Sequence, residues 1–360
     1  MKRSFNLAVL AIVVMLLHIS ALAQLPVATI NIGEFGQAIT LNPVTNKIYA
    51  IAEPSNQITE IDGATNDTVL IPLGTTSEPS LFGAFAVNPN TNKIYAVNVV
   101  DNSVWVIDGA TRALTAVPVG IHPVALDVNI VTNRIYAADS DSGSVSVIDG
   151  NTNETVSIPV GTTPLDVAVD PLRNRIYAVN TNSNDVTIIN GRNNRVIKAV
   201  PVGPFPSAVK VNPFTNKIYV TNTTGNSVTV IDGATRETTT IAVGFFPDCL
   251  AINPITNKIY VGNLSDDTIT VIDGATNSTS TVTVGLTPFG ISIDLLRNKI
   301  YVANGESNTF SVVDGATNSV RSVPSAGNLI LGIVVNPVTN KIYAINNVSG
   351  TVDVFDGGKL

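Results

Sequence analysis

Residues 208–244 read AVKVNPFTNKIYVTNTTGNSVTVIDGATRETTTIAVG, and this stretch decides the fold. It contains four short β-rich runs separated by turn residues, at 208–211, 217–220, 227–231 and 238–243. Pro213 presets φ for the first turn, and Asn216 tolerates the left-handed conformation that leads into the next run. Four short strands with turns at fixed offsets are typical of one blade of a β-propeller.

The same unit recurs along the whole chain, with spacings of 41, 42 or, once, 46 residues. All eight tyrosines occupy one position of it: Tyr49, Tyr95, Tyr136, Tyr177, Tyr219, Tyr260, Tyr301 and Tyr343. Thirteen residues after each Tyr stands Asp-Gly or, once, Asn-Gly, at Asp62, Asp108, Asp149, Asn190, Asp232, Asp273, Asp314 and Asp356. A fixed period of this length indicates a repeat architecture, and the lack of a 3.6-residue apolar period excludes a helical solenoid.

The number of strands predicts how the ring closes. A fourth run follows each of the first seven copies, but the chain ends just after the third run of the eighth copy. Residues 26–33 have the pattern of the missing run. We therefore predict an all-β, eight-bladed propeller of four-stranded antiparallel blades, in which the N-terminal strand completes the last blade and removes two exposed sheet edges.

The N-terminus has the features of a secretory signal peptide. Lys2 and Arg3 precede an apolar run from Leu7 to Leu17, and Ala-Leu-Ala ends at residue 23. The run is shorter than the roughly 20 apolar residues that span a bilayer. We expect cleavage after residue 23, a single propeller domain over residues 24–360, and a location in the periplasm or outside the cell.

Composition limits the possible partners. Residues 24–360 contain 18 basic and 27 acidic side chains and no basic run, which argues against binding to nucleic acid or to anionic membranes. The single cysteine, Cys249, cannot form an internal disulfide. We expect no membrane insertion and a monomeric protein.

One motif resembles a known family. Residues 219–222 read YVTN, and related patterns recur as YVGN at 260–263, YVAN at 301–304 and VIDG at 271–274. These resemble the YVTN family of propellers, found in periplasmic and cell-surface proteins of bacteria and archaea. The resemblance implies an exported propeller without assigning an activity. YAIA at 49–52 and Asn190 in place of Asp depart from the pattern without affecting the fold.

The eight copies diverge most in one set of loops. The Asn-Pro-x-Thr-Asn turns and the Asp-Gly turns lie on one side of the disc, the turn face, and are nearly the same in every blade. An acid repeated eight times around a ring cannot form one asymmetric site, so we interpret it as a turn residue that accepts backbone N–H bonds. The loops of the opposite side, the open face, diverge, and any unique site should lie there.

Three departures mark the open face. Loop 75–82 is longer than its counterparts and accounts for the 46-residue spacing. Phenylalanines gather in the segments that lead into the blades: Phe35, Phe82, Phe205, Phe245, Phe246 and Phe289. They could form a hydrophobic rim that binds a ligand or a protein, or each could pack over the neighbouring blade. Acids occupy the other loops of this face: Asp101, Asp139, Asp141, Asp185, Asp266, Asp267 and Glu306. They could bind Ca²⁺, or they could be solvated turn residues.

The first strand of each blade lines the central channel of a propeller. One position of these strands is small in most copies, and its residues are Ala38, Ala84, Ala125, Asp166, Ala208, Cys249, Gly290 and Gly332. We therefore interpret Cys249 as a small packed residue. Two residues later stand Thr40, Ala86, Asp127, Ala168, Lys210, Ala251, Ser292 and Val334. Asp127, Asp166 and Lys210 are therefore the polar candidates for the channel, with His122 in a loop of the open face.

The sequence favours a non-catalytic binding or scaffold module for a small molecule or a protein. Its candidate binding residues are Phe35, Phe82, His122, Asp127, Asp166, Phe205, Lys210, Phe246 and Phe289. No catalytic or metal-ligating set is apparent, and we predict no cofactor. Two alternatives remain open. One is a propeller enzyme of the lactonase or lyase type. The other is a haem d1-type propeller in which His122 would ligate the iron, although basic partners for the haem carboxylates are sparse.

Overall fold

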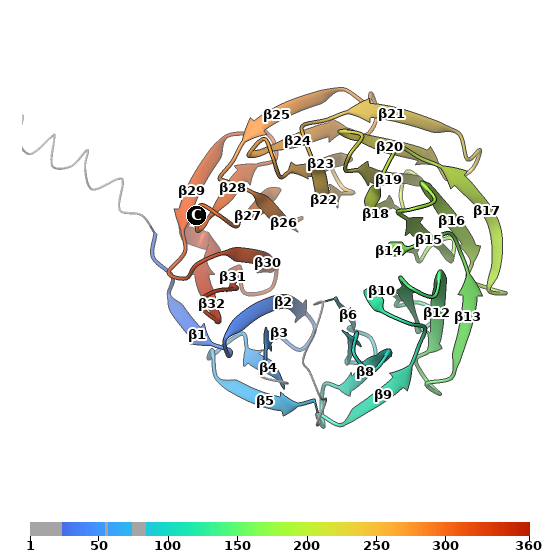
Figure 1. Ribbon diagram of the computed structural model, residues 1–360. Coiled ribbons are helices and arrows are strands. Elements are labelled where there is room, and N and C mark those ends of the chain that lie inside the picture. Colours follow the sequence, from blue (N-terminus) through green and yellow to red (C-terminus); the bar gives the residue numbers. More distant parts are fainter. Residues whose placement is uncertain (1–23, 55–56, 74–83) are drawn as a thin grey trace, which may run out of the picture.

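The computed structural model describes residues 24–54, 57–73 and 84–360, and these form a closed ring of eight blades (Figure 1). Each blade is a four-stranded antiparallel sheet, so the predicted all-β, eight-bladed propeller is confirmed. A short 3₁₀ helix, η2 (Gly357–Lys359), follows the last strand. Within the described part of the chain, no helix has the length and apolar character needed to cross a membrane.

The strands occupy four concentric positions in the ring. The innermost strands are β2 (Phe35–Asn42), β6 (Phe85–Asn88), β10 (Pro123–Asn129), β14 (Pro164–Asp170), β18 (Pro206–Asn212), β22 (Pro247–Asn253), β26 (Pro288–Asp294) and β30 (Ile330–Asn336). The second strands are β3 (Lys47–Glu53), β7 (Lys93–Asn98), β11 (Arg134–Asp139), β15 (Arg175–Asn180), β19 (Lys217–Asn222), β23 (Lys258–Asn263), β27 (Lys299–Asn304) and β31 (Lys341–Asn346).

The third strands are β4 (Gln57–Asp62), β8 (Ser103–Asp108), β12 (Ser144–Asp149), β16 (Asp185–Asn190), β20 (Ser227–Asp232), β24 (Thr268–Asp273), β28 (Thr309–Asp314) and β32 (Thr351–Asp356). The outermost strands are β5 (Thr68–Pro72), β9 (Leu114–Pro118), β13 (Thr155–Pro159), β17 (Arg195–Pro201), β21 (Thr238–Ala242), β25 (Thr279–Thr283), β29 (Val320–Pro324) and β1 (Ala28–Asn31).

The two ends of the chain share the last blade, as the sequence predicts. β1 pairs antiparallel with β32, with Ala28 opposite Val354 and Asn31 opposite Thr351. The hydroxyl of Thr29 also donates a hydrogen bond to Asp353 Oδ1 at 2.6 Å. The strand order of this sheet is β1-β32-β31-β30, so the ring is closed by backbone pairing between its first and last strands.

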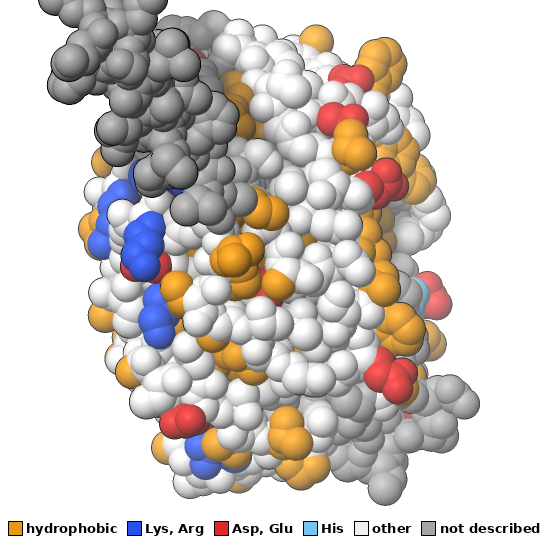
Figure 2. All heavy atoms as spheres, turned by 90° about the vertical axis from the view of Figure 1, so that its left-hand side faces the viewer, with side chains coloured by type: hydrophobic (Ala, Val, Ile, Leu, Met, Phe, Trp, Pro, Cys, Tyr) orange, Lys and Arg blue, Asp and Glu red, His pale blue; other side chains and the backbone are white. Residues whose placement is uncertain are grey.

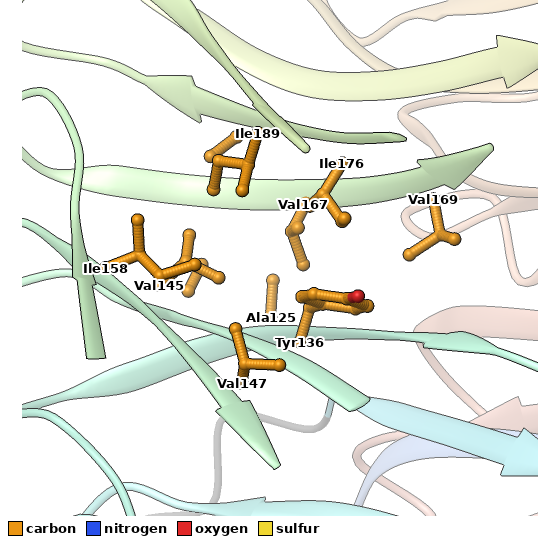
Figure 3. Packing of buried hydrophobic residues seen from close by; sticks show 11 residues of the cluster. Ala125, Tyr136, Val145, Val147, Ile158, Val167, Val169, Ile176 and Ile189 are labelled. Atoms are coloured by element: carbon orange, nitrogen blue, oxygen red, sulfur yellow. The ribbon is translucent and has the colours of Figure 1, made fainter. Parts of the chain in front are cut away.

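The apolar core lies between neighbouring blades. The ring of Tyr136 packs with Val145 and Val147 of its own blade and with Val167 and Ile176 of the next (Figure 3). All eight repeat tyrosines are completely buried, and an aromatic side chain of this kind removes roughly 150–250 Å² from water. The repeated tyrosine therefore joins each blade to its neighbour.

A belt of asparagines joins the blades on the turn face. Asn42 Oδ1 accepts the N–H groups of Val44 and Thr45, which shapes its own turn, while Asn42 Nδ2 donates to Asn92 Oδ1 of the next blade at 2.8 Å. Five further pairs repeat this bond: Asn88–Asn133, Asn129–Asn174, Asn212–Asn257, Asn253–Asn298 and Asn336–Asn46. The last pair crosses the closure between blades eight and one.

Two blades replace this asparagine by aspartate, and each makes a matching change three residues later. Asp170 pairs with Arg173 at 3.1 Å, and Asp294 pairs with Arg297 at 2.8 Å, whereas the other six turns have Thr at the position of the arginine. Both aspartates are fully buried. A buried carboxylate needs a charged or hydrogen-bonding partner, so the arginine accompanies the aspartate for a physical reason.

Basic residues at the start of the second strands make a further set of bonds between blades. Lys93 Nζ donates to the carbonyl of Gly150 in the next blade at 2.7 Å. The equivalent bonds are Arg134–Gly191, Arg175–Gly233, Lys217–Gly274, Lys258–Gly315 and Lys341–Gly63. Most polar residues that repeat on the turn face therefore hold the ring together.

The Asp-Gly turns confirm the interpretation of their repeated acid. Asp232 Oδ1 accepts the N–H groups of Ala234 at 2.8 Å and Thr235 at 2.9 Å. These bonds hold the pKa of Asp232 below its ordinary value, because they favour the ionised carboxylate. Gly233 is required because a Cβ there would lie 2.3 Å from Asn216 Oδ1.

Candidate functional site

The open face is acidic. Within the described part of the chain, its loops and adjoining strand ends contain no Lys or Arg, but they carry Glu34, Glu53, Asp101, Asp139, Asp141, Asp185, Asp266, Asp267 and Glu306. Seen from the side, Lys and Arg gather along one edge of the disc and most visible acids along the opposite edge (Figure 2). A surface that carries negative charge attracts cationic groups and repels anionic ones.

Two phenylalanines project from this acidic face on a strained backbone. Phe205 and Phe246 have φ of 52° and 55°, a left-handed conformation that is uncommon for bulky residues. The preceding blade holds each of them, because Asn184 Oδ1 accepts the N–H of Phe205 at 2.8 Å and Asn226 Oδ1 accepts that of Phe246 at 3.1 Å. Both residues remain 45% exposed, so they present apolar surface to solvent.

The same backbone conformation occurs in sister blades with other side chains. Thr163 and Thr287 have φ of 58° and 55° at the equivalent position, and Leu329 has 59°. The left-handed conformation therefore belongs to the fold, whereas the aromatic side chain does not. The choice of Phe at positions 205 and 246 adds surface that folding does not require.

The remaining phenylalanines are placed differently from one another. Phe35 is the first residue of β2 and Phe289 the second residue of β26, so both lie at the start of an innermost strand. A Cβ on Gly305 would lie 2.7 Å from Cδ2 of Phe289, so this ring partly packs against a neighbouring loop. Phe245 is well exposed, and its N–H donates to Asp266 Oδ2 at 2.6 Å. Phe82 and loop 75–82 lie outside the described residues.

Three of the predicted channel residues meet on consecutive innermost strands. Asp127 of β10 accepts the N–H of Val169 in β14 at 2.7 Å, and Asp166 of β14 accepts the N–H of Val209 in β18 at 2.8 Å. Each carboxylate thus bonds to the backbone of the next blade, which gives it a structural role. Lys210 Nζ lies 3.7 Å from Asp166 Oδ2.

Electrostatics couple these channel residues. Burial raises the pKa of Asp127 to about 6, although the positive charge of Lys210 opposes the rise. The negative charges of Asp166 and Asp127 raise the pKa of Lys210. The Lys210 side chain remains 48% accessible to solvent, so its ammonium group is not enclosed by the protein. Asp127, Asp166 and Lys210 therefore form one group of interacting charges on the innermost strands.

Comparison of the eight copies in the sequence missed a third acid beside this group. The pKa of Asp248, in β22, is raised by burial and further by the charge of Asp166, whereas a hydrogen bond from Ser207 opposes the rise. Asp248 directly follows the first residue of its strand, a position that holds Ser207 and Phe289 in sister blades. Comparing the copies at that position would have found it.

His122 lies apart from the channel group, on the open face. Its Nδ1 is 3.4 Å from Asp141 Oδ1, and its backbone N–H donates to Asn102 Oδ1 at 2.8 Å. Asp141 is well exposed, so the pair sits in water and not in a closed cavity. The structure therefore does not bring His122, Asp127, Asp166 and Lys210 together around one point.

Cys249 is packed as predicted. Its Sγ lies 3.3 Å from the carbonyl oxygen of Pro288 in the next blade. Gly262 makes room for it, because a Cβ on Gly262 would lie 2.5 Å from the sulfur. Burial raises the pKa of the thiol to about 12, which keeps it protonated and unreactive near neutral pH.

The acids of the open-face loops take part in local hydrogen bonds. Asp101 accepts a bond from Asn98 Nδ2 at 2.9 Å, and Asp185 accepts one from Asn180 Nδ2 at 2.6 Å. In residues 24–54, 57–73 and 84–360, no three His, Cys, Asp or Glu side chains are grouped so that they could hold a metal ion. These contacts favour the interpretation of the acids as turn residues.

Asp139 is an exception among the acids because it is fully buried. It accepts hydrogen bonds from the hydroxyls of Ser144 at 3.1 Å and Ser146 at 2.8 Å through Oδ2, while Oδ1 has no hydrogen-bond partner. Burial raises the pKa of Asp139 to about 6. Six sister blades have Asn at this position: Asn98, Asn180, Asn222, Asn263, Asn304 and Asn346.

Comparison with known proteins supports the fold only. No family model matches the sequence, and no curated protein matches it. A chain of hydrazine synthase from Kuenenia stuttgartiensis is similar in structure, with a TM-score of 0.64, 19% identity, and coverage of 79% of this chain and 98% of that chain. A chain of a mitotic checkpoint complex has a TM-score of 0.64 and 12% identity, covering 76% of this chain and 86% of that chain.

Proposed function

We propose that this propeller is an exported, non-catalytic binding module, related to the YVTN type of repeat, whose open face binds a protein partner. The observation that carries the proposal is the combination of exposed aromatic rings at Phe205, Phe246 and Phe245 with loops that contain acids and, in the described residues, no Lys or Arg. Export rests on the signal-like segment at residues 1–23.

The chemistry of this face limits the partner. Aromatic side chains provide apolar contact area, and they also attract Lys and Arg through their ring faces. The surrounding carboxylates favour cationic groups over phosphates, acidic sugars or the carboxylates of haem. A polypeptide segment that combines apolar and basic side chains fits both features.

Peptide selection tests the proposal. Residues 24–360 are immobilised, a displayed library of random peptides is selected on them, and one enriched peptide is synthesised for calorimetry. We expect enriched sequences to combine Lys or Arg with apolar residues. Burying one Phe contributes roughly 1.5–3 kcal/mol, so the Phe205→Thr/Phe246→Thr double variant should bind the peptide at least about tenfold more weakly.

Threonine is the appropriate replacement, because Thr163 and Thr287 already occupy the same backbone conformation in sister blades. The matched control is Phe214→Thr, which removes an exposed Phe from the turn face and should leave peptide affinity unchanged. Three results would overturn the proposal: no enrichment over a blank surface, enrichment of acidic peptides, or loss of binding in Phe214→Thr with the double variant unaffected.

A further inference from the structure

The turn face carries a ring of exposed apolar side chains. They occupy the third position of the Asn-Pro-x-Thr-Asn turn in seven of the eight blades, at Val44, Val131, Leu172, Phe214, Ile255, Leu296 and Val338. Each is between 63% and 74% exposed. Single exposed apolar residues are common on protein surfaces, but a repeated set on one face indicates an interaction site.

The fold itself does not require an apolar residue at this position. The remaining blade, formed by β6 to β9, has Asn90, whose N–H donates to Asn88 Oδ1 at 3.1 Å, just as the N–H of Val44 donates to Asn42 Oδ1 at 3.1 Å. A polar side chain is therefore compatible with the same turn. The apolar residues in the other seven blades contribute little to the folded ring and remain in contact with water.

The ring has a continuous apolar surface where blades seven and eight meet. A groove of about 510 Å³ lies there between neighbouring turns. It is lined by Ile293, Leu295, Leu296, Val335, Pro337 and Val338. The exposed residues of these two blades thus form one surface and not two separate points.

We propose that a second copy of this chain covers the ring, so that two propellers associate turn face to turn face. Nearly equivalent points on a circle suit a partner with the same arrangement, and a two-fold axis brings one ring onto an identical ring. Sequence alone led us to expect a monomer, an expectation that gave no weight to this ring.

Charge favours this pairing of faces. The charges near the ring have both signs, because in seven blades the Lys or Arg that begins the second strand lies opposite an aspartate of the third strand, as Lys93 lies opposite Asp108. Two turn faces can therefore meet without a strong excess of one sign. The open face carries acids without Lys or Arg in its described loops, so two open faces would repel each other.

The apolar area is near that of a specific interface. At about 25 cal/mol per Å², the 1.5–3 kcal/mol for burying one such side chain corresponds to roughly 60–120 Å². Seven side chains then supply roughly 400–800 Å² per partner, compared with about 800 Å² per partner in a standard interface. A dimer of moderate affinity is the expected result.

Sedimentation of residues 24–360 over a range of concentrations tests the proposal. We expect the mass of a dimer, and the mass of a monomer for Leu172→Asp/Phe214→Asp/Ile255→Asp. The matched control, Ile121→Asp/Phe245→Asp/Leu286→Asp, places the same change on exposed apolar residues of the open face and should remain dimeric. All six positions are exposed, so unchanged thermal unfolding should confirm that each variant folds.

Two results would overturn the proposal. One is a wild-type protein that stays monomeric up to about 1 mM, the affinity range of very weak complexes. The other is a monomer that floats with phosphatidylcholine vesicles when the turn-face triple variant does not, because the ring would then bind a membrane surface. Neither result bears on peptide binding at the open face, so this proposal can fail without the proposed function.

Discussion

The two faces of the disc use the same repeat in opposite ways. On the turn face, repeated polar residues such as Asn212 and Lys217 bond to the next blade, so their repetition follows from ring closure. On the open face, the backbone is repeated but the side chains are not, as Phe205 and Thr163 show. Repetition alone therefore does not separate structural from functional residues; the contacts of each side chain do.

The largest expected effect concerns ring closure, on which both faces depend. Deleting residues 24–33 removes β1 together with the buried Ile30 and Ile32. Burying two such side chains contributes roughly 3–6 kcal/mol, and the exposed edge of β32 adds to the loss. Urea unfolding should show a free energy lower by at least this amount, whereas deletion of residues 24–25 alone should have a small effect. An unchanged midpoint for the longer deletion would show that β1 does not close the ring.

The second effect comes from the blade in which Asp139 replaces the repeated Asn. The folded protein binds a proton at Asp139 more tightly than the unfolded chain does, because the pKa is about 6 when folded and about 3.9 when unfolded. The contribution of Asp139 to the free energy of unfolding should therefore be greatest below pH 4, fall between pH 4 and 6, and stay level above that. Asp139→Asn should remove this part of the dependence and stabilise the protein at pH 7 by up to about 3 kcal/mol.

The reverse change provides the control for that pH dependence. Asn222 is buried beside Ser227 and Thr229, much as Asp139 is buried beside Ser144 and Ser146. Asn222→Asp should destabilise the protein at neutral pH and add a second fall in stability. Asp127, which also has a raised pKa, remains in every variant, so the comparison uses differences from the wild type. Equal pH profiles for wild type and Asp139→Asn would contradict this account.

A third effect tests the structural role of the turn-face belt. Asn212→Ala removes the bond to Asn257 and the bonds that shape its own turn, and leaves buried backbone and amide groups without partners. We expect a loss of about 1–3 kcal/mol in the free energy of unfolding, with peptide affinity at the open face unchanged. A loss of affinity without a loss of stability would mean that the belt belongs to the binding surface.

The smallest effect on stability should come from the apolar ring. Ile255→Asn copies the residue that Asn90 provides in a sister blade, and Ile255 is well exposed. Exposed substitutions of this kind usually change the free energy of unfolding by less than about 0.5 kcal/mol. Dimer affinity should nevertheless fall in sedimentation. A large destabilisation would show that the ring supports the fold after all.

The sequence was sufficient to predict the fold, because the Tyr and Asp-Gly spacings record bonds that every blade makes. The closing strand followed from counting runs, and its pairing is confirmed. The site was less predictable. That Asp127 and Asp166 bond to Val169 and Val209 of neighbouring blades depends on distances across the ring, which local patterns do not contain.

Two further features were recognised only in the structure. Asp248 lies beside Asp166 only in the folded channel, although the two residues are far apart in the chain. The apolar third position of the turns is visible in seven of the eight copies, but only the structure shows that these side chains are largely exposed to solvent.

Hydrogen exchange with and without the selected peptide tests the central claim most directly. If the open face binds the partner, protection should increase in residues 202–206 and 243–247, which carry Phe205 and Phe246, and should remain unchanged in the turn at 212–216. Protection of the turns at 212–216 and 253–257, with no change in the loops around Phe205 and Phe246, would contradict the claim that binding depends on the face where the blades differ.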